Sequence, residues 1–270
     1  MPHVESNGIN LYYEEHGQGE PLVLIMGFTM SSVGWHWNVE RFAQSLRTIV
    51  FDNRGVGQSD KPDEPYAMTT FADDTAGVLD RLNIDKAHVF GISMGGMIAQ
   101  EFALRHPNRV KSLILGCTNC GGEKTLLSQD PEVVNILTNI ADVSVEQAAL
   151  AMTKVAVTPR FTQQHMSTLL ELTQLSSQHP TPKHGMVNQM AGIQGHDTYG
   201  RLPDITAPTL VITGKEDGLV PPENSATLAQ RIPNADLAIL SNASHLFNIE
   251  LAHTTVDLVT EFIQRQREWQ

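Results

Sequence analysis

Cysteine is scarce in this chain: only two of its 270 residues, Cys117 and Cys120, which form a single C-x-x-C pair. A zinc site made from cysteine pairs needs a second pair, and a thioredoxin-like motif opens its own βα unit, whereas this pair follows a predicted strand. The sequence also lacks an H-E-x-x-H motif or a comparable ligand cluster. We therefore expect two structural cysteines and no metal.

Basic residues are outnumbered: 18 lysines and arginines stand against 30 aspartates and glutamates, for a formal net charge of −12. The acidic residues are spread along the chain and form no tail, which is typical of a solvated surface. Such a charge argues against a nucleic-acid partner and against a patch for anionic membranes.

Long apolar runs are missing as well. The longest early run, residues 22–26, is far too short to span a bilayer. No N-terminal segment combines basic residues with an apolar stretch, as a secretory signal does. We expect no membrane insertion and, by default, a cytoplasmic location; the sequence leaves the oligomeric state open.

Glycine-rich loops of the kind that cradle phosphates are incomplete. The loop at Gly55 and Gly57 lacks a third glycine at dinucleotide spacing, and Gly214-Lys215 lacks the upstream glycine of a P-loop. The sequence therefore indicates no nucleotide, and we expect no cofactor of any kind.

What the chain does contain is an alternation of strand-like and helix-like segments. Asn7-Gly8 between two β-prone runs predicts a hairpin, because both positions tolerate positive φ. Apolar runs then predict strands at residues 22–26, 48–52, 88–91, 110–116, 209–213 and 236–240. This pattern and 41% hydrophobic content predict an α/β core, with a mostly parallel central sheet flanked by helices, plus an insertion.

The strand signal disappears between about residues 120 and 201. Helical patterns cover residues 131–141, 144–156, 162–174 and 183–194, and Ser144 with Gln147 makes a capping box for the second. The simplest interpretation is a helical cap at residues 120–201, inserted in a core of residues 1–119 and 202–270 and lying over the site. A closing helix is expected from residue 252 to about 267.

The most informative motif is Gly91-Ile92-Ser93-Met94-Gly95, between a predicted buried strand and a helix-like run. A serine hydroxyl is a poor nucleophile unless a sharp strand-to-helix turn exposes it beside a base. The flanking glycines leave room where a larger side chain would meet the adjoining strand or helix. The alternative is an ordinary turn serine, but the strand–turn–helix setting favours a nucleophile.

Four further segments belong to the same pattern. Two precede the serine motif: an apolar strand that leads into Gly27-Phe28, and an Asp-x-Arg-Gly-x-Gly-x-Ser loop that begins at Asp52. Two follow it: Gly214-Lys215-Glu216-Asp217 and Asn242-Ala243-Ser244-His245. With the serine motif, they resemble the α/β-hydrolase superfamily over nearly the whole chain. The resemblance implies the α/β-hydrolase fold with an inserted helical cap. It also implies a chain order of nucleophile, acid and histidine.

The resemblance implies a catalytic triad of Ser93, Asp217 and His245. His245 takes the serine proton and later protonates the leaving group, while Asp217 orients the imidazole. It also implies an oxyanion hole formed by the backbone N–H groups of Phe28 and Met94. Many relatives carry His-Gly where this chain has Met26-Gly27, a departure that affects surrounding hydrogen bonds and not the backbone donor.

Other residues compete for these roles. Among the other histidines, one falls inside a strand, one before a proline, four in the cap and one on the last helix, namely His88, His106, His165, His179, His184, His196 and His253. His245, in contrast, follows the final strand directly. For the acid, Glu216 is adjacent to Asp217 and points elsewhere, and Asp52 more simply organises its own loop. The position after the strand that ends near Gly116 offers Cys117 and no carboxylate.

The substrate pocket is the least determined part of the site. Adaptable methionines in the cap and apolar residues near the triad are expected to line it, although core packing explains them as well. The residues chosen are Met26, Trp35, Met152, Met166, Met190 and Leu246.

These residues predict a serine hydrolase that cleaves small carboxylic esters or lactones through an acyl-enzyme. The chain looks similar to the branch of small carboxylesterases, enol-lactonases and cofactor-free haloperoxidases. Hydrolases of carbon–carbon bonds in ring-fission products share the triad but often have Asn where this chain has Ile92. They stay an alternative, as does a hydrolase-fold receptor for a small molecule.

Overall fold

The structure, a computed structural model, describes residues 2–140 and 142–268. Its centre is an eight-stranded sheet in the order β1-β2-β4-β3-β5-β6-β7-β8. The six strands from β4 to β8 in this order pair in parallel, and β1 and β2 are antiparallel. The strands are β1 (His3–Ser6), β2 (Ile9–His16), β3 (Glu20–Ile25), β4 (Leu46–Phe51), β5 (Ala87–Ile92), β6 (Val110–Gly116), β7 (Thr209–Gly214) and β8 (Ala235–Leu240).

The predicted hairpin joins β1 and β2. Asn7 and Gly8 have φ angles of 49° and 79°, as a tight hairpin turn requires. Ser6 pairs with Ile9 across the turn, and His3 pairs with Tyr12 at the far end. The mostly parallel sheet expected from the strand–helix alternation is confirmed.

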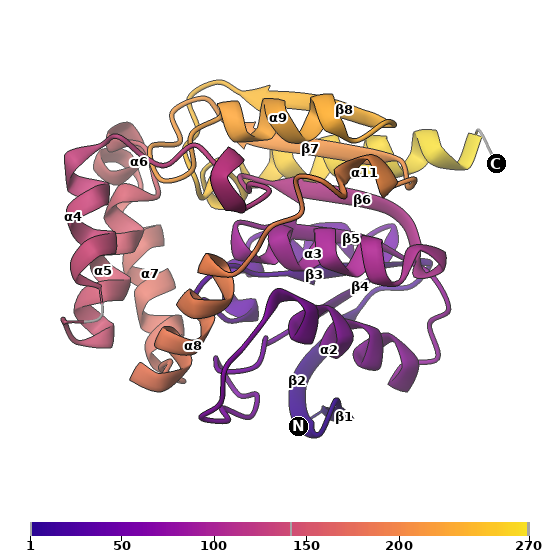
Figure 1. Cartoon of the computed structure of the whole chain (residues 1–270), viewed down its shortest axis with the longest axis horizontal. Helices are drawn as coiled ribbons and strands as arrows, with labels where there is room; N and C mark the ends of the chain where they lie inside the picture. Colours follow the sequence, from indigo (N-terminus) through magenta and orange to yellow (C-terminus); the bar gives the residue numbers. More distant parts are fainter. Residues whose placement is uncertain (1, 141, 269–270) are drawn as a thin grey trace.

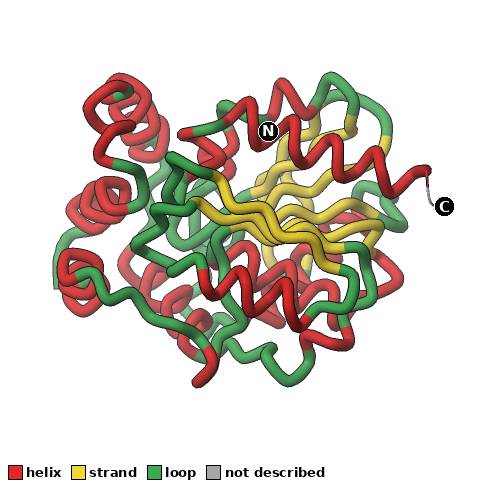
Figure 2. Tube along the Cα trace, turned by 90° about the horizontal axis from the view of Figure 1, so that it is seen from above, coloured by secondary structure: helices red, strands yellow, loops and turns green. Residues whose placement is uncertain are grey.

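Helices cover both faces of the sheet (Figures 1 and 2). Alternate residues of β3 show why: Val23 and Ile25 enter one apolar core, and Leu22 and Leu24 enter the other. Two core-facing sides explain why residues 22–25 of this strand are all apolar and buried. The first core contains α2 (Met68–Arg81), α3 (Met94–Arg105) and α9 (Glu223–Arg231), and the second α1 (Val39–Phe42) and α11 (Ala252–Glu268).

In the described residues between β6 and β7, five α-helices lie beyond one end of the sheet (Figure 1). The Ser144–Gln147 capping box is present at the start of the second. We refer to residues 120–201 as the insertion; this division of the chain into domains stays a prediction. Its helices are α4 (Pro131–Asn139), α5 (Val145–Val155), α6 (Pro159–Gln164), α7 (Met166–Ser177) and α8 (Lys183–Gln194). Residue 141, the expected end of the first helix, lies outside the described residues.

The single helix predicted at residues 162–174 is wrong, because two helices cover this stretch. Thr158 caps α6 by accepting a hydrogen bond from Phe161 N, and Pro159 occupies the first helical position. His165 then leaves the helical region, with φ −130° and ψ 37°, and its ring stacks on Phe161. A cap and a proline upstream therefore start the helix early, and the histidine divides it.

The two ends of the insertion lie side by side. Gly121 pairs with Asp197 in an isolated antiparallel bridge, and Thr198 N donates to Cys120 O at 2.8 Å. His196 is buried at this junction, and neither of its ring nitrogens has a hydrogen-bond partner within the described chain. Burial lowers the pKa of His196 to about 4. The ring is therefore neutral at pH 7.

Across the described ranges, no helix combines the length and the apolar character needed to cross a bilayer.

Candidate active site

Ser93 stands at the turn between β5 and α3, with φ 57° and ψ −122°. This backbone conformation is strained for a residue with a side chain, and such strain is concentrated at functional sites. The flanking glycines permit it. A Cβ on Gly91 would lie 2.0 Å from Gly95 O, and a Cβ on Gly95 would lie 2.2 Å from Ile25 O. The turn therefore closes only with glycine at both positions.

Hydrogen bonds from the neighbouring strand hold this turn. Ser93 N donates to Gly116 O at 2.8 Å, and Thr118 Oγ1 donates to Ser93 O at 2.7 Å. Both partners come from the end of β6 or just beyond it. The serine side chain itself is only half-buried, so its hydroxyl is accessible from the adjoining cavity.

Asp217 and His245 are brought together from the ends of two other strands. Asp217 Oδ1 accepts hydrogen bonds from Leu219 N and Val220 N, both at 2.9 Å. Its Oδ2 lies 2.8 Å from Nδ1 of His245, and both side chains are buried. The carboxylate is thus fixed by two backbone donors and directed at the imidazole.

The environment of His245 acts on its pKa in two directions. Burial lowers it, but the nearby Asp217 carboxylate, by charge and by hydrogen bond, outweighs burial and holds the pKa of His245 well above 6.5. An imidazole placed in this way accepts a proton readily. This is the behaviour required of a general base.

Ser93 and His245 both line one cavity. Among the described residues, no direct hydrogen bond joins the Ser93 hydroxyl to the imidazole. In enzymes without bound substrate such catalytic hydrogen bonds are often long, and they shorten in the substrate complex. The structure therefore brings Asp217 and His245 into contact and places the serine on the same cavity wall.

The loop after β3 passes directly beside the serine. A Cβ on Gly27 would lie 3.0 Å from Ser93 Cβ, so glycine allows this close approach. Phe28 follows Gly27, and Met94 is the first residue of α3, where backbone N–H groups lack helical partners. Neither N–H donates a hydrogen bond to another described residue. Both predicted oxyanion donors therefore remain unpaired in the loops beside Ser93.

Residues of the insertion hold this loop at Thr29, which the sequence did not single out. Thr29 has a φ of 59°, an outlier for a β-branched residue. Its N–H donates to Gln189 Oε1 at 2.9 Å, and its carbonyl accepts from Thr181 Oγ1 at 3.0 Å. Gln189 is fully buried and also donates through Nε2 to Arg54 O at 3.2 Å. The residue after Phe28 is thus fixed on both sides of its backbone.

The loop that carries His245 is held in a similar way. Ser244 N donates to Glu250 Oε2 at 2.6 Å, and Leu246 N donates to Ala156 O at 2.8 Å. The other oxygen of Glu250 accepts from both N and Oγ1 of Thr158, each at 2.7 Å. Sequence spacing gives no signal for Gln189 or for the contact of Glu250 with Thr158, because these partners are distant in the chain.

The cavity has a volume of about 170 Å³, which is room for on the order of ten waters. It lies between the catalytic loops and helices of the insertion. Of the six predicted pocket residues, Met26, Met152 and Leu246 line it. Met186, from α8, also lines it.

The other three predicted pocket residues lie elsewhere. Trp35 is fully buried against Phe90, with ring centroids 4.9 Å apart, so it supports the core instead of facing the cavity. Met166 is 48% exposed at the start of α7. Met190 packs on a small apolar cluster that includes Met186 and is not one of the residues that line the cavity. Met26, Met152 and Leu246 thus remain predicted substrate contacts.

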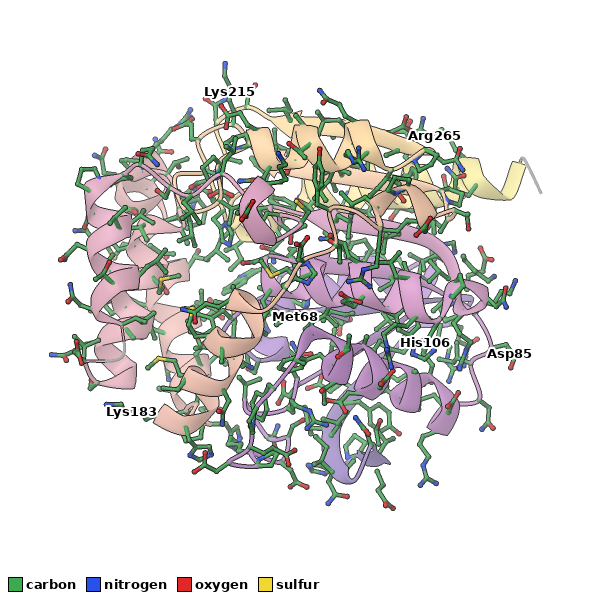
Figure 3. All side chains as sticks on the ribbon, viewed as in Figure 1. Met68, Asp85, His106, Lys183, Lys215 and Arg265 are labelled. Carbon is green, nitrogen blue, oxygen red and sulfur yellow. The ribbon has the colours of Figure 1, made fainter. Side chains whose placement is uncertain are left out.

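The competing acids and histidines have other partners. Asp52 accepts hydrogen bonds from the N–H groups of Ser32 and Gln58, both at 2.7 Å, and so organises its own loop. Glu216 is exposed. His106 binds Asp73 at 3.0 Å, at the end of the molecule opposite the insertion (Figure 3).

Cys117 and Cys120 are free thiols, and Cys117 lies directly beneath the site. Its Sγ donates a hydrogen bond to His245 O at 3.1 Å. The same sulfur lies within 4.8 Å of a carboxylate oxygen of Asp217 and of a ring nitrogen of His245. Burial raises the pKa of the Cys117 thiol. The thiol thus keeps its proton and can donate this hydrogen bond.

Comparison with known proteins places this geometry in a family. The family model described as the alpha/beta hydrolase fold matches residues 20–251, well over half of the chain. The chain therefore belongs to the α/β-hydrolase fold family, and it is a hydrolase.

Two solved structures and one sequence relative show the extent of the similarity. The structure titled "Est816 as an N-Acyl homoserine lactone degrading enzyme" has a TM-score of 0.85 and 32% identity, over 97% of this chain and 100% of that one. The enol-lactonase of Burkholderia xenovorans LB400 has a TM-score of 0.86 and 27% identity, with the same coverage. The 2-hydroxy-6-oxononadienedioate/2-hydroxy-6-oxononatrienedioate hydrolase of Burkholderia vietnamiensis is 32% identical, over 95% of this chain and 92% of the relative.

Proposed function

We propose that this chain is a serine hydrolase that cleaves carboxylic esters or lactones through an acyl-enzyme. Ser93 Oγ attacks the acyl carbonyl while His245 takes up its proton, and the same imidazole then protonates the leaving alcohol. Asp217 orients the ring and stabilises its charged form. The N–H groups of Phe28 and Met94 donate to the developing oxyanion, at about 3 kcal/mol each.

The observation that carries this proposal is the 2.8 Å contact between Asp217 Oδ2 and His245 Nδ1, on the cavity that Ser93 also lines. A carboxylate bound at Nδ1 fixes the tautomer that leaves Nε2 free to accept a proton. A base of this kind can deprotonate a hydroxyl that lines the same cavity. Ser93 is such a group, at a strained turn beside two unpaired N–H groups.

The test is hydrolysis of 4-nitrophenyl acetate and of a simple lactone by the whole chain. Ser93→Ala should lower kcat at least ~1,000-fold with an unchanged circular dichroism spectrum, because no other group supplies the nucleophile. Ser241→Ala, at an exposed serine, is the matched control and should keep the parent rate. Near-normal turnover by Ser93→Ala would reject the serine.

The cavity wall supports an acyl group that is apolar and uncharged. In the described part of the chain, its lining side chains are apolar, carry hydroxyls or are the histidines His179 and His245. Lys183 stands exposed at the outer end of α8, away from the sheet (Figure 3). We therefore include in the proposal a preference for neutral substrates.

A second candidate is hydrolysis of a carbon–carbon bond in a ring-fission product. It is favoured by the 32% identity to the Burkholderia vietnamiensis hydrolase, whose name describes a dioate substrate. Ile92, which lines the cavity of this chain, replaces the Asn common in such enzymes. Assaying a ring-fission dienone beside the esters separates the two, since the preferred class should show the higher kcat/KM.

A receptor would bind without sustained turnover. Many turnovers per molecule on any substrate of the panel would exclude a role limited to sensing. A single burst that stops after one equivalent would favour the receptor.

A further inference from the structure

We propose that the insertion holds both halves of the catalytic centre in place, with Gln189 positioning the oxyanion loop and Glu250 anchoring the histidine loop to it. This inference rests on the proposed function, because it assigns work to Phe28 and His245. It goes beyond that function by making the helical insertion a part of the catalytic machinery and not only a wall of the substrate cavity.

The oxyanion side rests on a strained backbone. Thr29 follows Phe28 and has a φ of 59°, which a β-branched residue keeps only when its surroundings enforce it. Gln189 accepts from its N–H at 2.9 Å, and Thr181 donates to its carbonyl at 3.0 Å. Both partners belong to the insertion, so the conformation of this loop depends on it.

Gln189 is suited to this role by its burial. Its amide is fully inaccessible to water, and its two ends bridge Thr29 N and Arg54 O. A buried amide that satisfies two backbone groups fixes their separation, since loss of the side chain leaves both groups unpaired. By holding Thr29 N, Gln189 restrains the loop that carries Phe28 N.

The histidine side rests on one carboxylate with three hydrogen bonds. Glu250 accepts from Ser244 N at 2.6 Å and from N and Oγ1 of Thr158, both at 2.7 Å. Thr158 is also the N-cap of α6. Glu250 thus connects the residue before His245 to the start of a helix in the insertion.

A second hydrogen bond holds the histidine loop at Leu246, the residue that follows His245. Leu246 N donates to Ala156 O at 2.8 Å, so both neighbours of His245 are tied to the stretch between α5 and α6. The groups that face the imidazole are the Asp217 carboxylate and the Cys117 thiol. Movement of the anchored loop changes the alignment with Asp217 first.

The two anchors predict different kinetic signatures. Loosening the histidine loop weakens the bond between His245 and Asp217, so the pH at which the base loses its proton falls. Loosening the oxyanion loop leaves the base intact and weakens transition-state stabilisation alone. A side chain with a merely structural role would lower stability and give neither pattern.

The experiment measures kcat and kcat/KM for 4-nitrophenyl acetate from pH 5.5 to 9 in four variants of the whole chain. In Glu250→Gln, one hydrogen-bond acceptor becomes a donor. The acidic limb, which is the rise of kcat/KM with pH as the base loses its proton, should then have its midpoint about 0.5 pH unit or more lower than in the parent. For Gln189→Met, which keeps the side-chain size, kcat should fall about 10- to 100-fold with the limb unmoved. Gln194→Met and Glu261→Gln, at exposed positions of α8 and α11, are the matched controls.

Each outcome decides between specific alternatives. Two results would overturn the positioning roles. The first is an unchanged pH profile and an unchanged kcat in both Glu250→Gln and Gln189→Met. The second is a loss of thermal stability in both variants together with losses of activity that are equal and independent of pH. If a variant fails to fold, two milder variants replace it and should give the same signatures at smaller size. Thr181→Val removes the single hydrogen bond to Thr29 O, and Thr158→Val removes the hydroxyl bond to Glu250 together with the N-cap bond from Phe161 N. Failure of the parent chain to hydrolyse the ester would instead reject the proposed function.

Discussion

A carboxylate at the far end of the acyl chain should strongly slow hydrolysis by this protein. The perturbation is a change in the substrate: the terminal methyl group of 4-nitrophenyl hexanoate is replaced by a carboxylate, as in the 4-nitrophenyl monoester of adipic acid. Within the described chain, the cavity lining supplies apolar groups, hydroxyls and two histidines but neither lysine nor arginine.

The size of the effect follows from desolvation of the carboxylate. Burying it without a cationic partner costs several kcal/mol, and hydroxyls such as those of Thr173 and Ser176 recover part of this cost. A remaining penalty of about 3 kcal/mol corresponds to a loss of roughly 100-fold in kcat/KM. The methyl ester of the adipate substrate has similar length and no charge, so it should lose less than about tenfold.

The assay compares kcat/KM for the three substrates at pH 8, where all nitrophenol released is readily detected. A cation at the cavity should weaken the preference: Ser176→Lys should narrow the gap in kcat/KM between hexanoate and adipate at least about tenfold. Ser167→Lys, on the same helix α7 but outside the lining, is the matched control and should leave the ratio unchanged. Adipate turnover within threefold of hexanoate would refute the reasoning.

Three further predictions concern pH and the cysteines. Because the pKa of His245 stands well above 6.5 and the base must be neutral, kcat/KM should rise with pH through a value above 6.5; a profile that is flat from pH 6 to 8 would contradict this role. Because the pKa of His196 is about 4 in the folded chain and near 6.5 in the unfolded chain, its contribution to stability is intact above pH 6.5. As the pH falls towards 4, this contribution is lost, and the free energy of unfolding decreases by about 3 kcal/mol. Urea unfolding at pH 4.5 and 7.5 should therefore show a smaller decrease in the free energy of unfolding for His196→Phe than for the parent. Cys120→Ala should keep the parent kcat. Cys117→Ser should keep most of it, because a hydroxyl can still donate a hydrogen bond to His245 O. A complete loss of turnover in Cys117→Ser would assign the thiol a catalytic role.

The sequence predicted the sheet and the turn at Ser93 because these features depend on local patterns. Apolar runs define strands buried on both faces, and Gly91 and Gly95 mark a turn that admits no larger side chain. Asp217 and His245 were predicted from the resemblance to α/β-hydrolases and from the rule that parallel strands deliver the groups at their carboxyl ends to one edge of the sheet. The structure brings the two side chains to 2.8 Å, and their catalytic roles stay a prediction.

The insertion was harder to read because long-range packing determines it. Periodicity across residues 162–174 did not reveal that His165 leaves the helical conformation. The methionine pattern also did not separate Met152, which lines the cavity, from the exposed Met166. Apolar side chains satisfy a core and a pocket equally well, so their position relative to the cavity appears only in three dimensions.

The paired ends of the insertion bear on how such a protein diversifies. Cys120 and Thr198 are joined by a backbone hydrogen bond of 2.8 Å, so a replacement segment can start and finish at neighbouring points without disturbing strand order. A transplanted segment, however, places its own residue at the position of Gln189. That residue must supply a hydrogen-bond acceptor for Thr29 N if the recipient loop is to keep its conformation. Swapping specificity by recombination at this junction therefore demands compatibility with the host's reaction centre as well as with the new substrate.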